Sequence, residues 1–97
     1  MANGILRFEW DSKKAASNLR KHRVSFEEAA LIFNDEFATF YEDPDHSQAE
    51  RRYLAIGISA RGRLLIVAFA YSGERIRIIN ARRVTTQERE MYEEEER

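Results

Sequence analysis

Arginines dominate the residues of this chain that could do chemistry, and they are concentrated in one segment. Residues 51–83 hold eight arginines against a single glutamate, a balance of +7, whereas residues 1–50 and residues 84–97 each carry a balance of −4. A basic middle between acidic ends indicates either a polyanionic partner or a basic surface covered by the acidic parts of the chain. Pairing of the two signs within the molecule is the simpler alternative.

RNA cleavage is a reaction that these residue types could support without a metal. The 2′-hydroxyl attacks the neighbouring phosphate, a base accepts its proton and an acid protonates the leaving oxygen. Cations stabilise the pentacoordinate phosphorane between these steps. The candidate catalytic residues are Lys21, His22, Arg82 and Arg83, and the candidate RNA-binding residues are Arg61, Arg63 and Arg77.

The same residues also have ordinary structural interpretations. Lys21 and His22 crowd the end of a predicted helix, where cations suit the helix dipole. Arg82 and Arg83 together lead into the last helix as solvated residues. Arg77 is a charge that would discourage pairing at a sheet edge. The sequence leaves both interpretations open.

The sequence does not contain the motifs that several other activities and binding sites require. The sequence contains no P-loop, no dinucleotide fingerprint and no HExxH motif, and it has no cysteine. Two histidines and scattered carboxylates make no convincing metal set, and residues 42–47 are interpreted as a solvated Asp-Pro turn. No metal and no cofactor is therefore predicted. No apolar run reaches 18 residues and the start of the sequence has no long apolar region, so neither a membrane span nor a signal peptide is expected. The lack of cysteine fits a reducing compartment, and a cytoplasmic location is predicted.

The main element predicted to position the basic residues is a β-hairpin. Strands are predicted over residues 64–71 and 75–84, joined by a turn at Gly73. The first strand is apolar on both faces, which predicts a central position in a sheet. In the second strand cations alternate with isoleucines along residues 75–78, so the cations there share one face.

The other elements are shorter. Further strands are predicted over residues 6–10, 37–41 and 53–59. Helices are predicted over residues 13–22 after an Asp11 N-cap, over residues 25–34 from the capping box Ser25–Glu28, and from the capping box Thr85–Glu88 through about Glu94. These elements predict an α+β fold with a small antiparallel sheet of four or five strands. Two N-terminal helices pack on one of its faces, a C-terminal helix follows, and residues 1–97 form a single domain.

Three segments resemble the BrnT family of toxins from bacterial type II toxin–antitoxin systems. They are FEWDSKKAASNLRKHRVSFEEAALIF, YLAIGIS and GERIRIINARRVTTQEREMYEE. The most specific pieces are Trp10-Asp11 with Asn18, Lys21, His22 and Ser25-Phe26, and Ala81-Arg82-Arg83 with Glu88, Arg89 and Tyr92. The chain departs from the family at Arg23, where a glycine that could cap the helix in the left-handed conformation is usual.

The resemblance implies a RelE-like fold and a ribonuclease that arrests growth. It also implies a cognate antitoxin, BrnA-like, with a ribbon–helix–helix part, so that DNA is contacted only through the complex. The last helix has only Met91 and Tyr92 as sizeable apolar groups. We therefore expect it to be weakly attached and these two residues to contact the antitoxin. A catalytically silent regulatory module, binding protein or nucleic acid through the same basic sheet, is the alternative.

Overall fold

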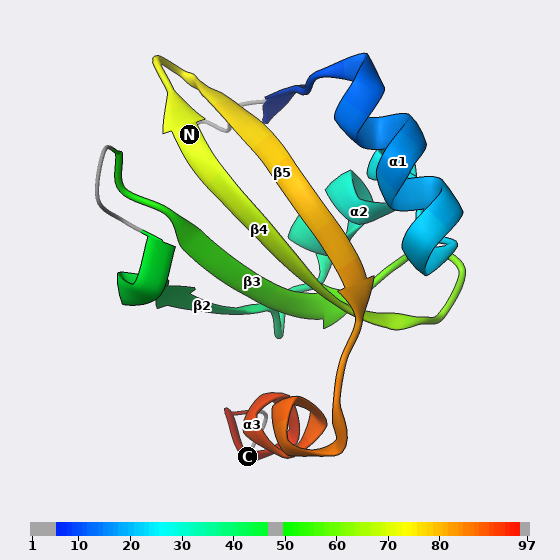
Figure 1. The fold of residues 1–97 in the computed structure, drawn as a ribbon. Coiled ribbons are helices and arrows are strands. Elements are labelled where there is room, and N and C mark those ends of the chain that lie inside the picture. Colours follow the sequence, from blue (N-terminus) through cyan, green and yellow to red (C-terminus); the bar gives the residue numbers. More distant parts are fainter. Residues whose placement is uncertain (1–5, 47–49, 96–97) are drawn as a thin grey trace.

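Five strands form one sheet in the order β1-β5-β4-β3-β2 (Figure 1). The structure, a computed structural model, describes residues 6–46 and 50–95. The predicted α+β fold is confirmed, and β4 is central, as its apolar pattern predicts. The strands are β1 (Arg7–Glu9), β2 (Thr39–Glu42), β3 (Tyr53–Ile58), β4 (Leu64–Ser72) and β5 (Arg75–Arg83). The helices are α1 (Ser12–His22), α2 (Phe26–Ala30) and α3 (Thr86–Glu95), with 3-10 turns η1 (Leu31–Asn34) and η2 (Pro44–His46).

The sequence predicts an antiparallel sheet, but the sheet in the structure is only mostly antiparallel. β1 runs parallel to β5, with Phe8 opposite Ile76, whereas the other three strand pairs are antiparallel. The physical reason is connectivity. A hairpin forces its two strands to be antiparallel, but β1 reaches β5 through the whole of the chain between them, so no hairpin sets its direction.

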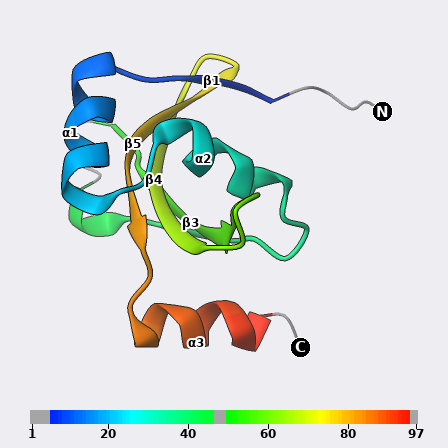
Figure 2. The ribbon, with the colours of Figure 1, turned by 90° about the vertical axis from the view of Figure 1, so that its right-hand side faces the viewer.

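The sheet curves around α2 and η1, which gives it an inner and an outer face (Figure 2). The inner face holds the larger core, where Phe26 and Ile32 are fully buried against Leu65, Val67 and Phe69 of the central strand region. The predicted helix over residues 25–34 is α-helical only as far as Ala30 and then tightens into η1. Because a 3-10 turn aligns residues three apart, Ile32 lies in the core behind Phe26 and Ala29.

Helix α1 covers an edge of the sheet. β1 pairs only with residues 75–77 of β5, which leaves the later backbone of that strand open on this side. The buried Asn18 side chain takes the place of a neighbouring strand. Its Nδ2 donates to the Ala81 carbonyl at 2.8 Å, and its Oδ1 accepts from the Ala81 amide at 3.1 Å. The expectation that both N-terminal helices lie on one face is therefore correct for α2, while α1 lies along β5 (Figures 1 and 2).

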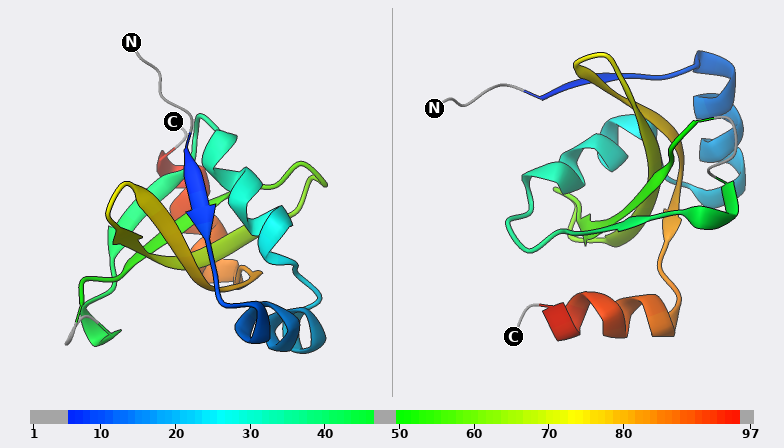
Figure 3. Two further views of the ribbon diagram at one scale, coloured as in Figure 1. Left: turned by 90° about the horizontal axis from the view of Figure 1, so that it is seen from above. Right: turned by 90° about the vertical axis from the view of Figure 1, so that its left-hand side faces the viewer.

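Helix α3 packs on the outer face (Figures 2 and 3). Tyr92 is 3% exposed and lies against Ile56, Leu64 and Ile66 of the two central strands. Its hydroxyl donates to Asp35 Oδ2 at 2.7 Å. The expected weak attachment of α3 does not fit this burial, because the ring of Tyr92 already contacts its own core. A contact of Tyr92 with the antitoxin stays a prediction. Met91 is only half-buried and remains a candidate contact.

Candidate functional site

An irregularity in the pairing of β4 with β5 decides which basic residues share the outer face. Ile78 pairs with Phe69 but Asn80 pairs with Ala68, so Ile79 is an extra residue in β5. Such a bulge shifts the alternation of side chains by one position. Arg82 therefore lies opposite Ile66 and faces outwards with Asn80.

Three of the predicted site residues meet in one groove. Lys21 and His22 from the last turn of α1 and Arg82 from β5 line a groove of about 390 Å³, which we call the helix-side groove. Asn80 of β5 and Lys14 of α1 line the same groove. The other polar lining residues, Ser17, Asn18 and Asn80, are uncharged, and no acidic side chain of the described residues lines this groove. This is a setting for a phosphate group.

A second groove adjoins the first and shares Asn80 and Arg82 with it. This sheet-side groove has a volume of about 360 Å³ and runs across β5, β4 and β3 to η2. At its far side the Nδ1 atom of His46 lies 3.1 Å from Oδ2 of Asp43. A carboxylate at Nδ1 orients an imidazole and favours the tautomer that leaves Nε2 able to accept a proton. The two grooves together therefore place an imidazole on either side of Arg82.

The guanidinium of Arg82 is held by Glu88 from the first turn of α3. Both bonds of this bidentate pair are 2.9 Å long. Hydrogen bonding to Glu88 raises the pKa of Arg82, and the same pairing lowers the pKa of Glu88 although burial opposes it. Glu88 also accepts from the Thr85 amide, which completes the predicted capping box. The start of α3 thus fixes the orientation of Arg82.

Arg83, predicted as catalytic beside Arg82, lies in a different place. It lines a cleft of about 350 Å³ together with Arg63 and Arg89, which we call the arginine cleft. Consecutive residues of a strand point to opposite faces, so the two arginines cannot enter one groove. Of the four predicted catalytic residues, the structure brings Lys21, His22 and Arg82 together and separates Arg83 from them.

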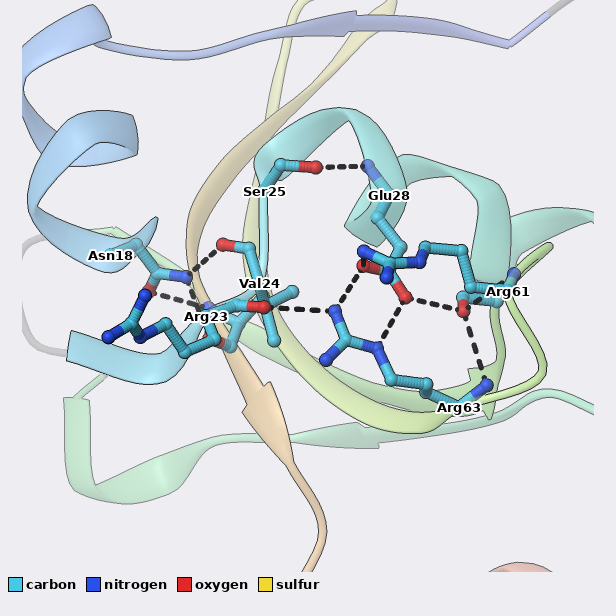
Figure 4. A network of polar contacts seen from close by, with 9 residues as sticks. Asn18, Arg23, Val24, Ser25, Glu28, Arg61 and Arg63 are labelled. Atoms are coloured by element: carbon cyan, nitrogen blue, oxygen red, sulfur yellow. Dashed lines mark hydrogen bonds and ion pairs between the residues drawn. The ribbon is translucent and has the colours of Figure 1, made fainter. Parts of the chain in front are cut away.

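Arg63, which lines the arginine cleft, also belongs to a polar network (Figure 4). The buried Glu28 carboxylate accepts from Arg63 Nε at 2.9 Å and from the Ser59 hydroxyl at 2.7 Å, and Arg63 Nη2 also bonds Glu28. A further bond of 2.9 Å joins Nη2 to the Arg23 carbonyl, and Arg23 itself adopts the left-handed conformation. Bonding to Arg63 lowers the pKa of Glu28 although burial opposes it.

We expect Glu28→Gln to destabilise the protein at neutral pH by about 3 kcal/mol, because it leaves the Arg63 guanidinium without its counter-charge. The pKa of Glu28 in the folded state is lower than its ordinary value of 4.5. Its contribution is therefore complete above pH 4.5 and is lost as the pH falls through the folded value. Denaturant unfolding should show the gap between wild type and variant narrowing below pH 4.5. Glu27→Gln, an exposed neighbour, is the control and should change little; a gap independent of pH would contradict the assignment.

The remaining predicted RNA-binding residues are surface cations with acidic neighbours. Arg61 is exposed, and its Nη1 lies 3.8 Å from Glu28. Arg77 faces outwards and is paired with Glu50. Phosphate binding by Arg61 or Arg77 therefore stays a prediction.

Sequence reasoning missed the other groups in the two grooves: Asn80, His46 with Asp43, and Glu88 as a partner of Arg82. The sequence pattern predicts a solvated turn at His46, and at Glu88 it predicts a helix cap and a position in the BrnT-like motif, with no indication of a bond to Arg82. One usable signal is the spacing of Asp43 and His46, because residues three apart in a helical turn lie close together.

The described part of the chain also bears on metal binding and membranes. Residues 6–46 and 50–95 contain no group of three or more acidic, histidine or cysteine side chains placed to hold a metal ion. In the same residues no helix is long and apolar enough to cross a membrane.

Comparison with known proteins identifies the family. A family model described as "Ribonuclease toxin, BrnT, of type II toxin-antitoxin system" matches residues 10–88, most of the chain. A crystal structure of the Brucella abortus ribonuclease toxin BrnT is similar in fold, with a TM-score of 0.64 and 21% sequence identity. The similarity covers 84% of this chain and 100% of that one, and at this identity it establishes the fold alone. A search of curated protein sequences found no match. The family match covers both strands of the central hairpin, Lys21, His22 and the Arg82–Glu88 pair, and it shows that the chain belongs to the BrnT family of ribonuclease toxins of type II toxin–antitoxin systems.

Proposed function

We propose that this chain is an endoribonuclease that cleaves RNA across the two grooves flanking Arg82, without a metal ion. One observation carries the proposal. Lys21 and His22 lie about sixty positions before Arg82 in the sequence, yet they line one groove with it. Family membership supports RNA as the substrate.

The chemistry needs two proton transfers and a stabilised phosphorane. Arg82 is suited to stabilise the charge of the phosphorane, because Glu88 already orients its planar guanidinium. Lys21 adds a second cation in the helix-side groove. His22 in one groove and His46 in the other are proposed as the base and the acid, the usual role of imidazole near neutral pH.

The bonds made and broken define the products. The 2′-oxygen forms a bond to phosphorus as the bond to the 5′-oxygen breaks, and one histidine takes the 2′-hydroxyl proton while the other protonates the leaving 5′-oxygen. The products are a 2′,3′-cyclic phosphate and a 5′-hydroxyl. Water is not consumed in this step, and no redox partner is needed.

Family membership also supports a biological setting in the cytoplasm, where the toxin is held inactive by a cognate antitoxin. We propose that this antitoxin has a ribbon–helix–helix part and inhibits by occluding the outer face near Arg77 and Met91. The acidic residues of such a partner would neutralise the arginines that otherwise attract RNA. Contact with DNA would then occur only through the complex.

The test is cleavage of RNA by the purified chain, freed of any partner, in the presence of excess chelator. Cleavage yielding 2′,3′-cyclic phosphate ends is expected. Loss of activity with chelator would contradict the metal-independent mechanism. If the protein binds RNA without cleaving it, the chain would instead be a catalytically silent binding module. Adding the product of a neighbouring ribbon–helix–helix gene should abolish cleavage.

A further inference from the structure

The arginine cleft is built from three separate segments of the chain. Gly62 and Arg63 come from the β3–β4 turn, Arg83 from the end of β5, and Arg89 from the first half of α3. Leu64 and Val84 complete its lining. Within residues 6–46 and 50–95, no acidic residue lines this cleft, although α3 is otherwise rich in glutamate.

The charge of the cleft is only partly neutralised. Glu28 pairs with Arg63. Arg83 and Arg89 are both exposed, and neither has an ion pair with any residue in the ranges that the structure describes. Two unneutralised guanidinium groups lining one cleft repel each other, and an anion between them relieves this repulsion.

The guanidinium of Arg63 is already held in one orientation, which favours binding of such an anion. Its Nε and Nη2 atoms are occupied by Glu28 and by the Arg23 carbonyl, which immobilise the guanidinium at 16% exposure and leave Nη1 outside these bonds. An arginine already held in one orientation loses less side-chain entropy when it binds. Planar guanidinium groups match the oxygens of a phosphate.

The cleft lies at the end of the sheet, one residue further along β5 than Arg82. Arg83 pairs with Leu65 of the inner core, whereas Leu64 and Val84 in the cleft lining belong to the outer cluster. An RNA strand whose scissile phosphate lies at Arg82 would therefore pass over the end of β5 before it reaches the cleft. We propose that the arginine cleft binds a second phosphodiester of the RNA substrate, away from the bond that is cut. This rests on the proposed function only for the identity of the ligand, and it assigns Arg83 to binding instead of catalysis.

The test measures binding of a single-stranded RNA oligomer with 2′-O-methyl riboses, which cannot be cleaved by the proposed mechanism. We expect the double variant Arg83→Ala/Arg89→Ala to flatten the slope of log K against log salt by about 1.4, because each lost contact with a single strand removes about 0.7. With 1 M salt as the reference, this corresponds to about 25-fold weaker binding at 0.1 M. The matched control is Arg75→Ala/Arg7→Ala, which removes two exposed arginines distant from the cleft.

Equal affinity and equal slope for the double variant and the control would overturn the inference. So would normal RNA binding combined with loss of antitoxin binding, because the cleft would then belong to the protein partner. Binding that responds to the cleft variant while unmodified RNA is never cut would support the inference and contradict the proposed ribonuclease activity. Unfolding by denaturant checks that both double variants remain folded.

Discussion

Replacing Arg82 by alanine is expected to lower kcat for RNA cleavage about a hundredfold, the effect of removing about 3 kcal/mol of transition-state stabilisation. Arg82 is the cation shared by both grooves, and Glu88 holds its guanidinium through two bonds of 2.9 Å. Stability should change far less. The Arg82 side chain is 38% exposed, so its ion pair contributes only about 0.5–1 kcal/mol.

Arg83→Ala is the matched control, because it removes the same charge from the adjacent residue on the opposite face of β5. It should raise KM and leave kcat nearly unchanged. Arg82→Lys keeps the charge but loses the bidentate geometry, so an intermediate kcat is expected. If Arg82→Ala keeps the kcat of the wild type, or if Arg83→Ala lowers kcat equally, the outer face is not the site of cleavage.

The two histidines are expected to produce the other large losses. His22→Ala and His46→Ala should each lower kcat by about 10²–10⁴, the usual contribution of a general acid or base. The wild type should show a bell-shaped dependence of kcat on pH, since one group must be deprotonated and the other protonated. Each variant should lose one limb of that bell, and the limb that disappears identifies the base and the acid.

Asp43→Asn provides the matched control for His46. It preserves the shape of the side chain that meets Nδ1 but removes the carboxylate charge that orients the ring. The expected kcat lies between those of the wild type and His46→Ala. An unchanged pH profile in His46→Ala would exclude this histidine and leave His22 as the only imidazole in the mechanism.

Local patterns were sufficient for most of the secondary structure. The apolar run before Gly73 predicts a central strand because both of its faces must be buried, and β4 is that strand. Asp11, Ser25 and Thr85 each accept a backbone N–H bond at the start of a helix, as their positions predict. These features depend on residues a few positions apart.

The capping box at Ser25 shows where local reasoning ends. Ser25 Oγ accepts from the Glu28 amide at 3.0 Å, as a capping box requires. The Glu28 carboxylate, however, bonds to Ser59 and Arg63, about thirty positions away. A charged partner in a buried site outweighs the local backbone donor, and nothing in residues 25–28 reveals that partner.

The sequence by itself determined the fold class, the order of the elements and the concentration of arginines in residues 51–83. It also identified Lys21, His22 and Arg82 as site candidates. Only the tertiary structure decided which arginine meets which partner. Strict alternation from Arg77 would place Arg83 on the outer face, but the extra residue at Ile79 places Arg82 there instead. A bulge depends on how two strands pair, and the side chains of either strand alone do not predict it. This pairing separates Arg82, the proposed catalytic arginine, from Arg83, the proposed phosphate-binding arginine.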